Sequence, residues 1–307
     1  MAEQHTKTIN DRTQHLFNLK VFEASYSSFP RGPKHGIKRY VKRWLDQPTT
    51  ILNSPLNYHQ LKHQSSSKTR PDYSAASHEH FIRVPSEDNR HEIRDNAGNI
   101  LADRFRVSIG LIKVLARSTT ALPVIPQTIT NRGAYTTRHY GMWADYSKDI
   151  FLTSEHKRDQ PASDNWFRDN EDLFRLLTNN LRVLNPEMYL KYTRVDPYLP
   201  AGLTRMAGAW HGVAINTGMV GGAGTAHIDH QDDKRGYNCV LPFGTYTGGD
   251  LVLWDIGVKY ELQPGDAVMF YSGVMAHNAS EVTSGSRNVV DMFVHRSNLA
   301  WAKRQKM

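Results

Sequence analysis

Eight short strand-like segments separated by tight turns occupy residues 209 to 295 of this 307-residue chain. They are rich in β-branched and aromatic residues and are bounded by Gly, Pro and Asp, which is typical of short β-strands. In the QPGD turn at 263–266, Pro264 and Gly265 suit a type II turn, and Asp266 can bond to its own turn. So many short strands predict a sandwich or jelly roll. The segments are 209–218, 227–229, 236–243, 250–254, 258–262, 266–272, 276–282 and 287–295.

Two predicted helices directly precede these strands. Asp164 or Asn165 can cap the first, whose apolar stripe continues to about residue 184. Asn185 can cap the second, with Pro186 at its first position. Helices in this position usually pack on one face of the sheet. The expected fold class is therefore α+β, with a double-stranded β-helix (jelly-roll) core buttressed by helices on one face.

The chain upstream of these helices has a less regular pattern. Residues 81–106 alternate around an Asn/Gly turn and predict a β-hairpin. Residues 107–117 fit either a strand or a short buried helix, and 63–77 predict an exposed loop. The section 127–165, which is rich in Tyr and Trp, has two interpretations: a loop or lid facing the substrate, or aromatic residues packed against the sheet.

The N-terminal part of the chain carries most of its positive charge. The formal net charge is +8, and residues 1–75 contain twelve Lys/Arg against five Asp/Glu. IKRYVKRWL, at 37–45, has the spacing of a short amphipathic helix. A basic segment can contact DNA or another polyanion, although a solvated surface without a partner explains the charge equally well. We predict a basic N-terminal extension over 1–78 and one catalytic domain over 79–307, with its β-core at 209–295.

Other bulk properties limit where the protein can act. Cys239 is the single cysteine, which excludes an intramolecular disulfide framework and fits a reducing compartment. No apolar run approaches the length of a membrane span, and the first residues lack the apolar region of a secretory signal. We expect an intracellular protein without a membrane partner. Nuclear and cytoplasmic locations both remain open.

Two histidines and an aspartate in the strand-rich section form a candidate metal site. His227 and Asp229 are two residues apart, so on an extended strand both side chains leave the same face. His277 follows 48 positions after Asp229, at the start of another strand-like run. Two imidazoles and one carboxylate are the ligand set of non-heme Fe(II) oxygenases.

A second H-x-D pair overlaps the first. It consists of His230 and Asp232, within the turn-like DHQDDKRG sequence. We favour His227 with Asp229, because His227 precedes the acidic cluster and lies closer to the strand. His211 and His295 are expected to be structural or to lie beside the metal ligands.

Several motifs in this section resemble the Fe(II)/2-oxoglutarate dioxygenases of the TET/JBP group, including their compact fungal and protist-type members. The motifs are HID followed by GY, then PFGTYTGGDLVL, LQPGDAVMFYSGVMAHNASEV and Arg287. The similarity covers about residues 180–295 and weakens upstream.

The resemblance implies specific residues and cofactors. Iron would bind to His227, Asp229 and His277, and Arg287 would pair with the distal carboxylate of 2-oxoglutarate. Asn216 is a further candidate contact to the cosubstrate or substrate. The implied cofactors are Fe(II), 2-oxoglutarate and O2, and the implied reaction oxidises a substrate C–H bond with release of succinate and CO2.

The substrate has a leading candidate and two alternatives. The resemblance and the basic extension together favour a modified pyrimidine base in nucleic acid, which would have to be flipped out of a duplex. The same chemistry on a free small metabolite or amino acid is the first alternative. A catalytically silent β-barrel binding module is the second. The sequence leaves open the substrate, the extent of its oxidation and the oligomeric state.

Overall fold

The fold was taken from a computed structural model. It describes residues 46–67, 71–73, 76–86, 90–130, 133–144, 148–221 and 224–306, so the predicted helix at 37–45 lies outside the described residues. The strands are β1 (Thr49–Asn53), β2 (Ile82–Val84), β3 (Arg90–Arg94), β4 (Ile100–Arg106), β5 (Thr128–Thr130), β6 (Gly133–Trp143), β7 (Phe151–Leu152), β8 (Gly212–Met219), β9 (Asn238–Gly248), β10 (Leu251–Leu253), β11 (Val258–Tyr260), β12 (Asp266–Phe270), β13 (His277–Ala279) and β14 (Val282–Phe293). The helices are α3 (Tyr58–Ser66), α4 (Ile109–Thr120), α5 (Ser154–Arg158), α6 (Ala162–Asp169), α7 (Glu171–Leu184), α8 (Pro186–Thr193) and α9 (Arg296–Gln305), with short 3-10 turns at Asp196–Tyr198 and Trp254–Ile256.

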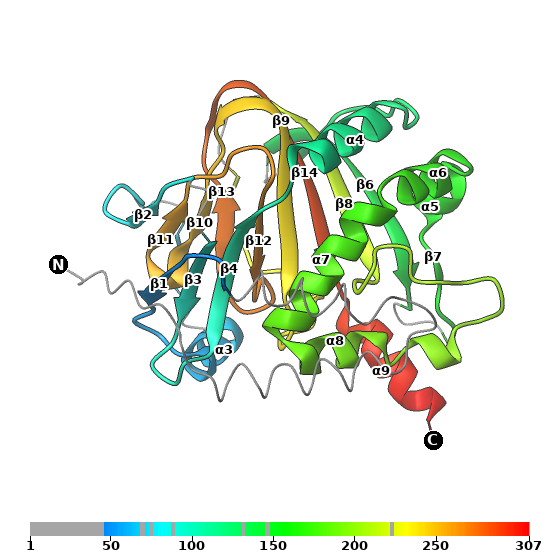
Figure 1. The fold of residues 1–307 in the computed structure, drawn as a ribbon, viewed down its shortest axis with the longest axis horizontal. Helices are drawn as coiled ribbons and strands as arrows, with labels where there is room; N and C mark the ends of the chain where they lie inside the picture. Colours follow the sequence, from blue (N-terminus) through cyan, green and yellow to red (C-terminus); the bar gives the residue numbers. More distant parts are fainter. Residues whose placement is uncertain are drawn as a thin grey trace.

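These elements form three layers. The large sheet has the strand order β1-β3-β4-β12-β9-β14-β8-β6-β5, with β7 beside β6, and the small sheet has the order β13-β10-β11-β2. Helices α7 and α8 lie across one face of the large sheet (Figure 1). One apolar core fills the space between these helices and the large sheet, and a second fills the space between the two sheets. This arrangement confirms the α+β class and the double-stranded β-helix core covered by helices on one face.

Several sequence-based expectations are confirmed. β3 and β4 form the hairpin, with Gly98 in the turn at a φ of 83°. The segment with two possible interpretations, 107–117, contains most of helix α4. Asn185 caps α8, where its side chain accepts a hydrogen bond from the Met188 N–H at 3.0 Å. In the 263–266 turn Gly265 has a φ of 95°, as position i+2 of a type II turn requires, and the Asp266 carboxylate accepts from the Gln263 N–H at 2.8 Å.

The helix predicted from Asp164 or Asn165 to about 184 is two helices, and the reason lies at Asn170. Its side-chain amide donates to the Trp166 carbonyl and to the Ser118 hydroxyl, both at 2.8 Å. A polar side chain that binds nearby backbone competes with helix continuation, so α6 ends here and α7 begins at Glu171. The predicted loop at 63–77 is also partly helical, because α3 extends to Ser66.

The described residues of the aromatic section 127–165 mostly form strands and helices, and its longest strand belongs to the large sheet itself. Its main element is β6, which pairs along β8 from Thr136 opposite Thr217 to Gly141 opposite Gly212. Tyr140 is fully buried beneath the helices. The weak periodicity of this stretch arises because β6 is covered on its helix side and only partly covered on the other. Helix α9 at the C-terminus was not predicted.

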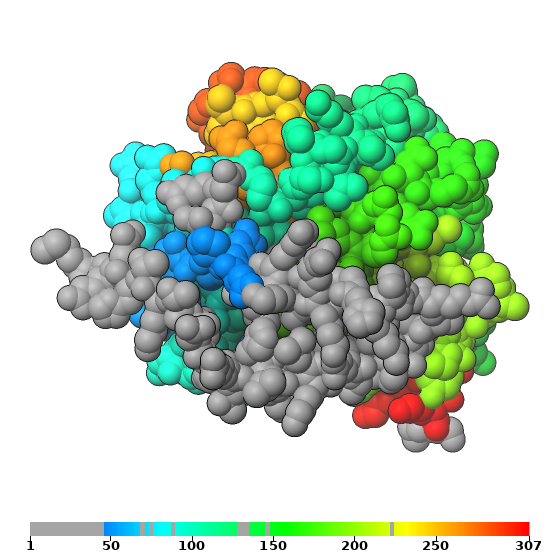
Figure 2. Space-filling view, in the orientation of Figure 1, coloured from blue at the N-terminus to red at the C-terminus, as the bar shows by residue number. Residues whose placement is uncertain are grey.

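Part of the predicted N-terminal extension belongs to the large sheet. β1 pairs in parallel with β3, from Thr49 opposite Arg90 to Asn53 opposite Arg94. This part of the chain, drawn in blue, is visible at the surface of the molecule (Figure 2). The boundary at residue 78 and the contact of the basic extension with DNA stay predictions. None of the helices within the described ranges is long and apolar enough to cross a lipid bilayer.

His211 has the structural role expected of it, and this makes stability depend on pH. Its ring is 1 % exposed, its Nε2 donates to the Tyr192 carbonyl at 2.9 Å, and burial lowers its pKa from 6.5 to about 3. Below pH 6.5 the unfolded chain therefore binds a proton that the folded protein does not. The free energy of unfolding should fall as the pH drops from 6.5 towards 3, with this residue contributing on the order of 4–5 kcal/mol in total.

Chemical denaturation at several pH values tests this expectation. His211→Gln should lower stability at pH 7 and flatten the decline below pH 6.5. His80→Gln, which changes an exposed histidine, should leave the decline as in the wild type. An equal slope in the wild type and the His211 variant would contradict the assignment.

Candidate metal centre

His227, Asp229 and His277 converge at one end of the space between the two sheets. His227 and His277 form an antiparallel bridge, with N–H to carbonyl distances of 3.0 and 2.9 Å. The His227 Nε2 lies 3.7 Å from one Asp229 oxygen, and the His277 Nε2 lies 3.4 Å from the other. All three ligand atoms lie within 4.8 Å of one another. Segments 50 residues apart in sequence are thus joined by backbone hydrogen bonds at the point where their side chains meet.

Backbone carbonyls determine which nitrogen of each histidine faces the aspartate. The His227 Nδ1 lies 2.8 Å from the Thr225 carbonyl, and the His277 Nδ1 lies 3.0 Å from the Met275 carbonyl. A carbonyl only accepts hydrogen bonds, so each Nδ1 carries the proton and each Nε2 keeps its lone pair. This is the tautomer that a metal-binding histidine needs, and a carbonyl partner of this kind orients the ring.

The three side chains fit a divalent metal ion. Two ligands at right angles around an ion, each at roughly 2.1 Å, are about 3 Å apart, so the 3.4 and 3.7 Å separations need only a small contraction. The His277 ring is buried and packs edge-on against Phe270, with ring centroids 4.9 Å apart. His227 and Asp229 are partly exposed. The residues therefore hold an ion from one side and leave the other side accessible.

The overlapping pair is not arranged in this way. His230 is exposed, and Asp232 is buried in a different set of contacts. The Asp232 carboxylate accepts from the Asn238 amide at 2.5 Å and lies 3.3 Å from the His295 Nδ1. Burial, together with the nearby Asp229 charge, raises the pKa of Asp232 well above its usual range.

Arg287 is buried, and none of the described acidic residues is paired with it. It is 3 % exposed, and burial lowers its pKa. Its guanidinium carbon lies 5.8 Å from the centre of the Tyr246 ring. Within the described part of the chain, no carboxylate lies within 4.0 Å of it, and its buried Nε has no hydrogen-bond partner. Asp250, whose charge acts on Arg287, is itself paired with Lys259 at 3.1 Å.

The glycine at position 249 makes room for this arginine. A Cβ there would lie 2.5 Å from the Arg287 Cδ, and the φ of Gly249 is 68°, which favours glycine. A buried cation with an unsatisfied donor is unfavourable unless an anion joins it. The arrangement therefore suits a carboxylate ligand beside Arg287.

Asn216 faces the space between the sheets. It lies opposite Val289 on β14 and Thr137 on β6, and Val289 belongs to the apolar core between the two sheets. Directly opposed residues share a face, so the half-buried Asn216 amide points the same way. No hydrogen bond joins it to another residue in the described ranges. Its role as a cosubstrate or substrate contact stays a prediction.

The sequence did not predict an aromatic cluster next to the three metal-site residues. The Trp143 and His295 rings are stacked with centroids 4.3 Å apart, and Phe293 contacts His295 at 4.7 Å. Asp232 connects this cluster to the metal site, because its N–H donates to the Asp229 carbonyl at 3.0 Å. Trp143 comes from β6, so only the pairing of β6 with β8 brings it here. A usable indication in the sequence was the alternation of Phe293 and His295 at the end of the last strand.

Comparisons with known proteins identify the fold. No protein-family profile and no curated protein sequence matches the chain. Among solved structures, NgTET1 in complex with 5mC DNA has 14% sequence identity and a TM-score of 0.59, and the match covers 94% of this chain and 92% of that one. A 2OG-Fe(II) oxygenase family protein from Burkholderia pseudomallei has 15% identity over 64% of this chain and 85% of that one, with a TM-score of 0.42. The chain therefore shares its overall fold with NgTET1, a structure it resembles over almost its whole length.

Proposed function

We propose that this protein is an Fe(II)/2-oxoglutarate-dependent dioxygenase whose substrate is a modified pyrimidine base in nucleic acid. The observation that carries the reaction class is the convergence of His227, Asp229 and His277, with both Nε2 lone pairs turned toward the carboxylate. This donor set, open on one side, suits non-heme Fe(II) rather than a closed structural zinc site. Arg287 is buried and has no carboxylate partner among the residues that the structure describes, which supports a dicarboxylate cosubstrate.

Each residue has a distinct task in this proposal. The two imidazoles and Asp229 hold the metal, and the Thr225 and Met275 carbonyls keep the imidazoles in the required tautomer. Arg287 pairs with the far carboxylate of 2-oxoglutarate through charge-assisted hydrogen bonds. Iron with this cosubstrate supplies the oxidation of a substrate C–H bond, coupled to release of succinate and CO2. The buried surroundings of His277 exclude water from one side of the site.

The aromatic cluster and the fold similarity support a pyrimidine substrate. The half-buried Trp143 offers flat apolar surface, its ring is supported by the buried His295 and Phe293, and the Asp232 carboxyl lies against His295. Stacking surface next to polar groups that can meet a base edge is what binding of a flipped base requires. NgTET1, a solved structure that shares this fold, is in complex with 5mC DNA.

Succinate formation measured with a set of substrates tests the proposal. A duplex containing 5-methylcytosine should stimulate release of succinate, whereas the same duplex without the methyl group and a panel of free amino acids and metabolites should not. Stimulation should weaken steeply as salt rises, because contacts to phosphates release bound counterions. Equal stimulation by a free metabolite would favour the small-molecule alternative, and no turnover with any candidate would favour a binding module.

Trp143→Ala is expected to weaken use of DNA without affecting the cosubstrate. The variant removes the ring stacked on His295, and base–aromatic stacking contributes about 1–3 kcal/mol, so KM for methylated DNA should rise roughly 5- to 150-fold. KM for 2-oxoglutarate should stay unchanged. Leu190→Ala, at an exposed apolar position on α8, serves as the control. An unchanged KM for DNA would remove Trp143 from the substrate site.

A further inference from the structure

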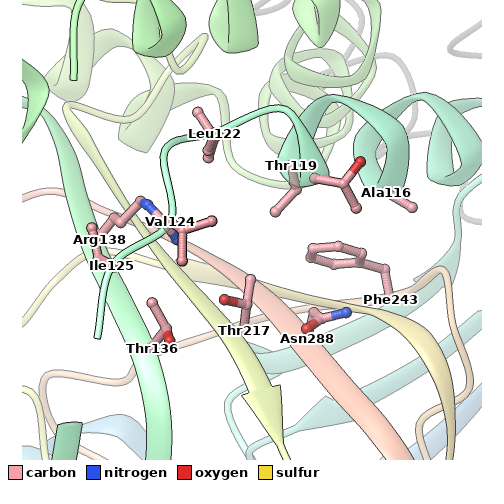
Figure 3. A pocket seen from close by; sticks show the side chains of 11 residues that line it. Ala116, Thr119, Leu122, Val124, Ile125, Thr136, Arg138, Thr217, Phe243 and Asn288 are labelled. Carbon is pink, nitrogen blue, oxygen red and sulfur yellow. The ribbon is translucent and has the colours of Figure 1, made fainter. Parts of the chain in front are cut away.

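A cavity lies on the helix-covered side of the large sheet, apart from the metal site. Its volume is about 310 Å³, it is open to solvent on one side, and it is lined by the end of α4, the segment that follows α4, and strands β6, β8, β9 and β14 (Figure 3). The three metal-site residues lie toward the other side of this sheet, since His277 belongs to the small sheet. Nothing in the proposed reaction uses this cavity.

One wall of the cavity is polar where the rest of that sheet face is apolar. Thr136, Thr217 and Asn288 line it from the adjacent strands β6, β8 and β14. Elsewhere on the same face, Ile215 and Val290 are fully buried in the core beneath the helices. Three neighbouring strands thus place half-buried polar groups side by side at one end of this sheet face.

The hydrogen bonds of these polar groups leave donors available. The Asn288 Oδ1 accepts from the Gly218 N–H at 2.9 Å, so its amide nitrogen keeps its two hydrogens. Neither Thr136 nor Thr217 has a side-chain hydrogen bond to another residue in the described part of the chain. At the end of α4, the Thr119 carbonyl accepts a hydrogen bond from the Leu122 N–H at 3.2 Å. This carbonyl is therefore already bonded and does not point unpaired into the cavity.

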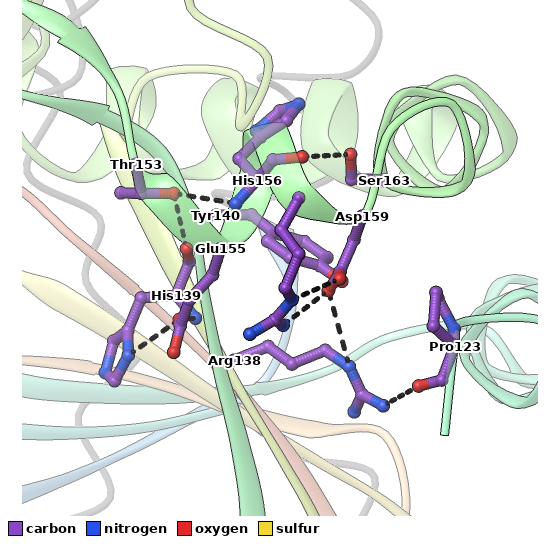
Figure 4. A network of polar contacts seen from close by, with 10 residues as sticks. Pro123, Arg138, His139, Tyr140, Thr153, Glu155, His156, Asp159 and Ser163 are labelled. Atoms are coloured by element: carbon purple, nitrogen blue, oxygen red, sulfur yellow. Dashed lines mark hydrogen bonds and ion pairs between the residues drawn. The ribbon is translucent and has the colours of Figure 1, made fainter. Parts of the chain in front are cut away.

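Arg138 places a positive charge at this wall, and a carboxylate neutralises that charge only in part. The side chain is 5 % exposed and lines the cavity, and one terminal nitrogen donates to the Pro123 carbonyl (Figure 4). Its Nε lies 4.0 Å from Asp159 and has no hydrogen-bond partner among the described residues. Asp159 is already paired with Arg158 at 2.7 and 2.9 Å and accepts from the Tyr140 hydroxyl at 2.6 Å. Asp159 is therefore paired more closely with Arg158 than with Arg138.

The opposite wall of the cavity is apolar. Leu122, Val124 and Ile125, from the segment after α4, and Phe243 on β9 supply the apolar lining, with Val124 exposed at its mouth (Figure 3). A cavity with an apolar body and a few converging polar groups is the usual form of a small-molecule site. The charge at one end and the apolar surface at the other restrict the kind of ligand that fits.

We propose that this cavity binds a small monocarboxylate with a short apolar body. The carboxylate pairs with Arg138 and accepts hydrogen bonds from Asn288 and the two threonines, and the apolar chain lies between Phe243 and the segment after α4. The site is separate from that of 2-oxoglutarate. Asn288 and Arg287 are neighbours on β14, and Asn288 lines this cavity while Arg287 contacts Gly249 and Tyr246.

Calorimetric titration of the full-length protein with hexanoate tests the proposal. The titration is carried out with 2-oxoglutarate and Mn²⁺ at saturating concentration, so that the metal centre is occupied and cannot take up hexanoate. One hexanoate per chain should bind. 1-Hexanol, which has the same chain without the charge, should bind at least about tenfold more weakly, as expected for loss of a hydrogen bond to a charged group. Absence of saturable binding, or equal affinity for the alcohol, would overturn the proposal.

Variants then locate the binding. Arg138→Gln should weaken hexanoate binding at least about tenfold, and Ala116→Phe, which places a ring in the cavity, should abolish it. If Arg138→Gln does not fold, Ala116→Phe and the isosteric Thr217→Val decide the matter. Lys113→Gln, which removes an exposed charge from the same helix, should bind as the wild type does. Undiminished binding in the folded Ala116→Phe variant would show that hexanoate binds elsewhere and would overturn the proposal.

Discussion

Asp229→Ala is expected to abolish succinate formation. The variant removes the carboxylate that faces both imidazole Nε2 atoms, at 3.7 and 3.4 Å. Loss of an outer partner of a metal ligand costs about 10–100-fold in affinity or activity, and loss of a ligand itself should exceed this. The measurements are succinate release and the visible charge-transfer absorption that Fe(II) with 2-oxoglutarate gives under anaerobic conditions. Both should disappear, while circular dichroism should remain that of the wild type because Asp229 is partly exposed.

The neighbouring histidine provides a matched control. His230→Ala changes an exposed side chain one position further along the chain and should keep both the absorption band and turnover. The pair of variants therefore distinguishes the two overlapping H-x-D pairs. Retention of the band in Asp229→Ala together with its loss in His230→Ala would contradict the proposed metal site.

Arg287→Ala is expected to raise the 2-oxoglutarate requirement with little change in metal binding. Hydrogen bonds to charged groups contribute about 1.5–3 kcal/mol, so the dissociation constant for 2-oxoglutarate should rise roughly 10- to 150-fold. Without cosubstrate the variant should be at least as stable as the wild type, because it removes a buried charge that has no carboxylate partner within the described ranges. Binding titrations and thermal unfolding, each with and without 2-oxoglutarate, measure the two effects.

Two further variants separate charge from geometry. Arg287→Lys keeps a positive charge but loses the planar, two-pronged donor arrangement, so its affinity should lie between those of the wild type and the alanine variant. Arg296→Ala, at an exposed arginine on α9, should have no effect. Unchanged affinity for 2-oxoglutarate in Arg287→Ala would remove Arg287 from the cosubstrate site.

The strand-rich half of the fold was predictable because local patterns suffice there. Short alternating segments and turns such as QPGD determine where strands begin and end, and Gly265 has the positive φ that its turn requires. Elements that depend on contacts with distant parts of the chain were harder to predict from the sequence. β6 is recognisable only from its pairing with β8, and the split between α6 and α7 depends on the Asn170 contact with Ser118, 52 positions away.

The sequence alone determined the residue types of the candidate site: an H-x-D pair on an extended segment, a later histidine and an arginine in the last strand. Only the tertiary structure decided which of the two H-x-D pairs meets His277. The bridge between His227 and His277 aligns those side chains, while Asp232 turns into contacts with Asn238 and His295. The physical reason is that side-chain direction follows from backbone pairing across 50 residues, which spacing along the chain does not specify.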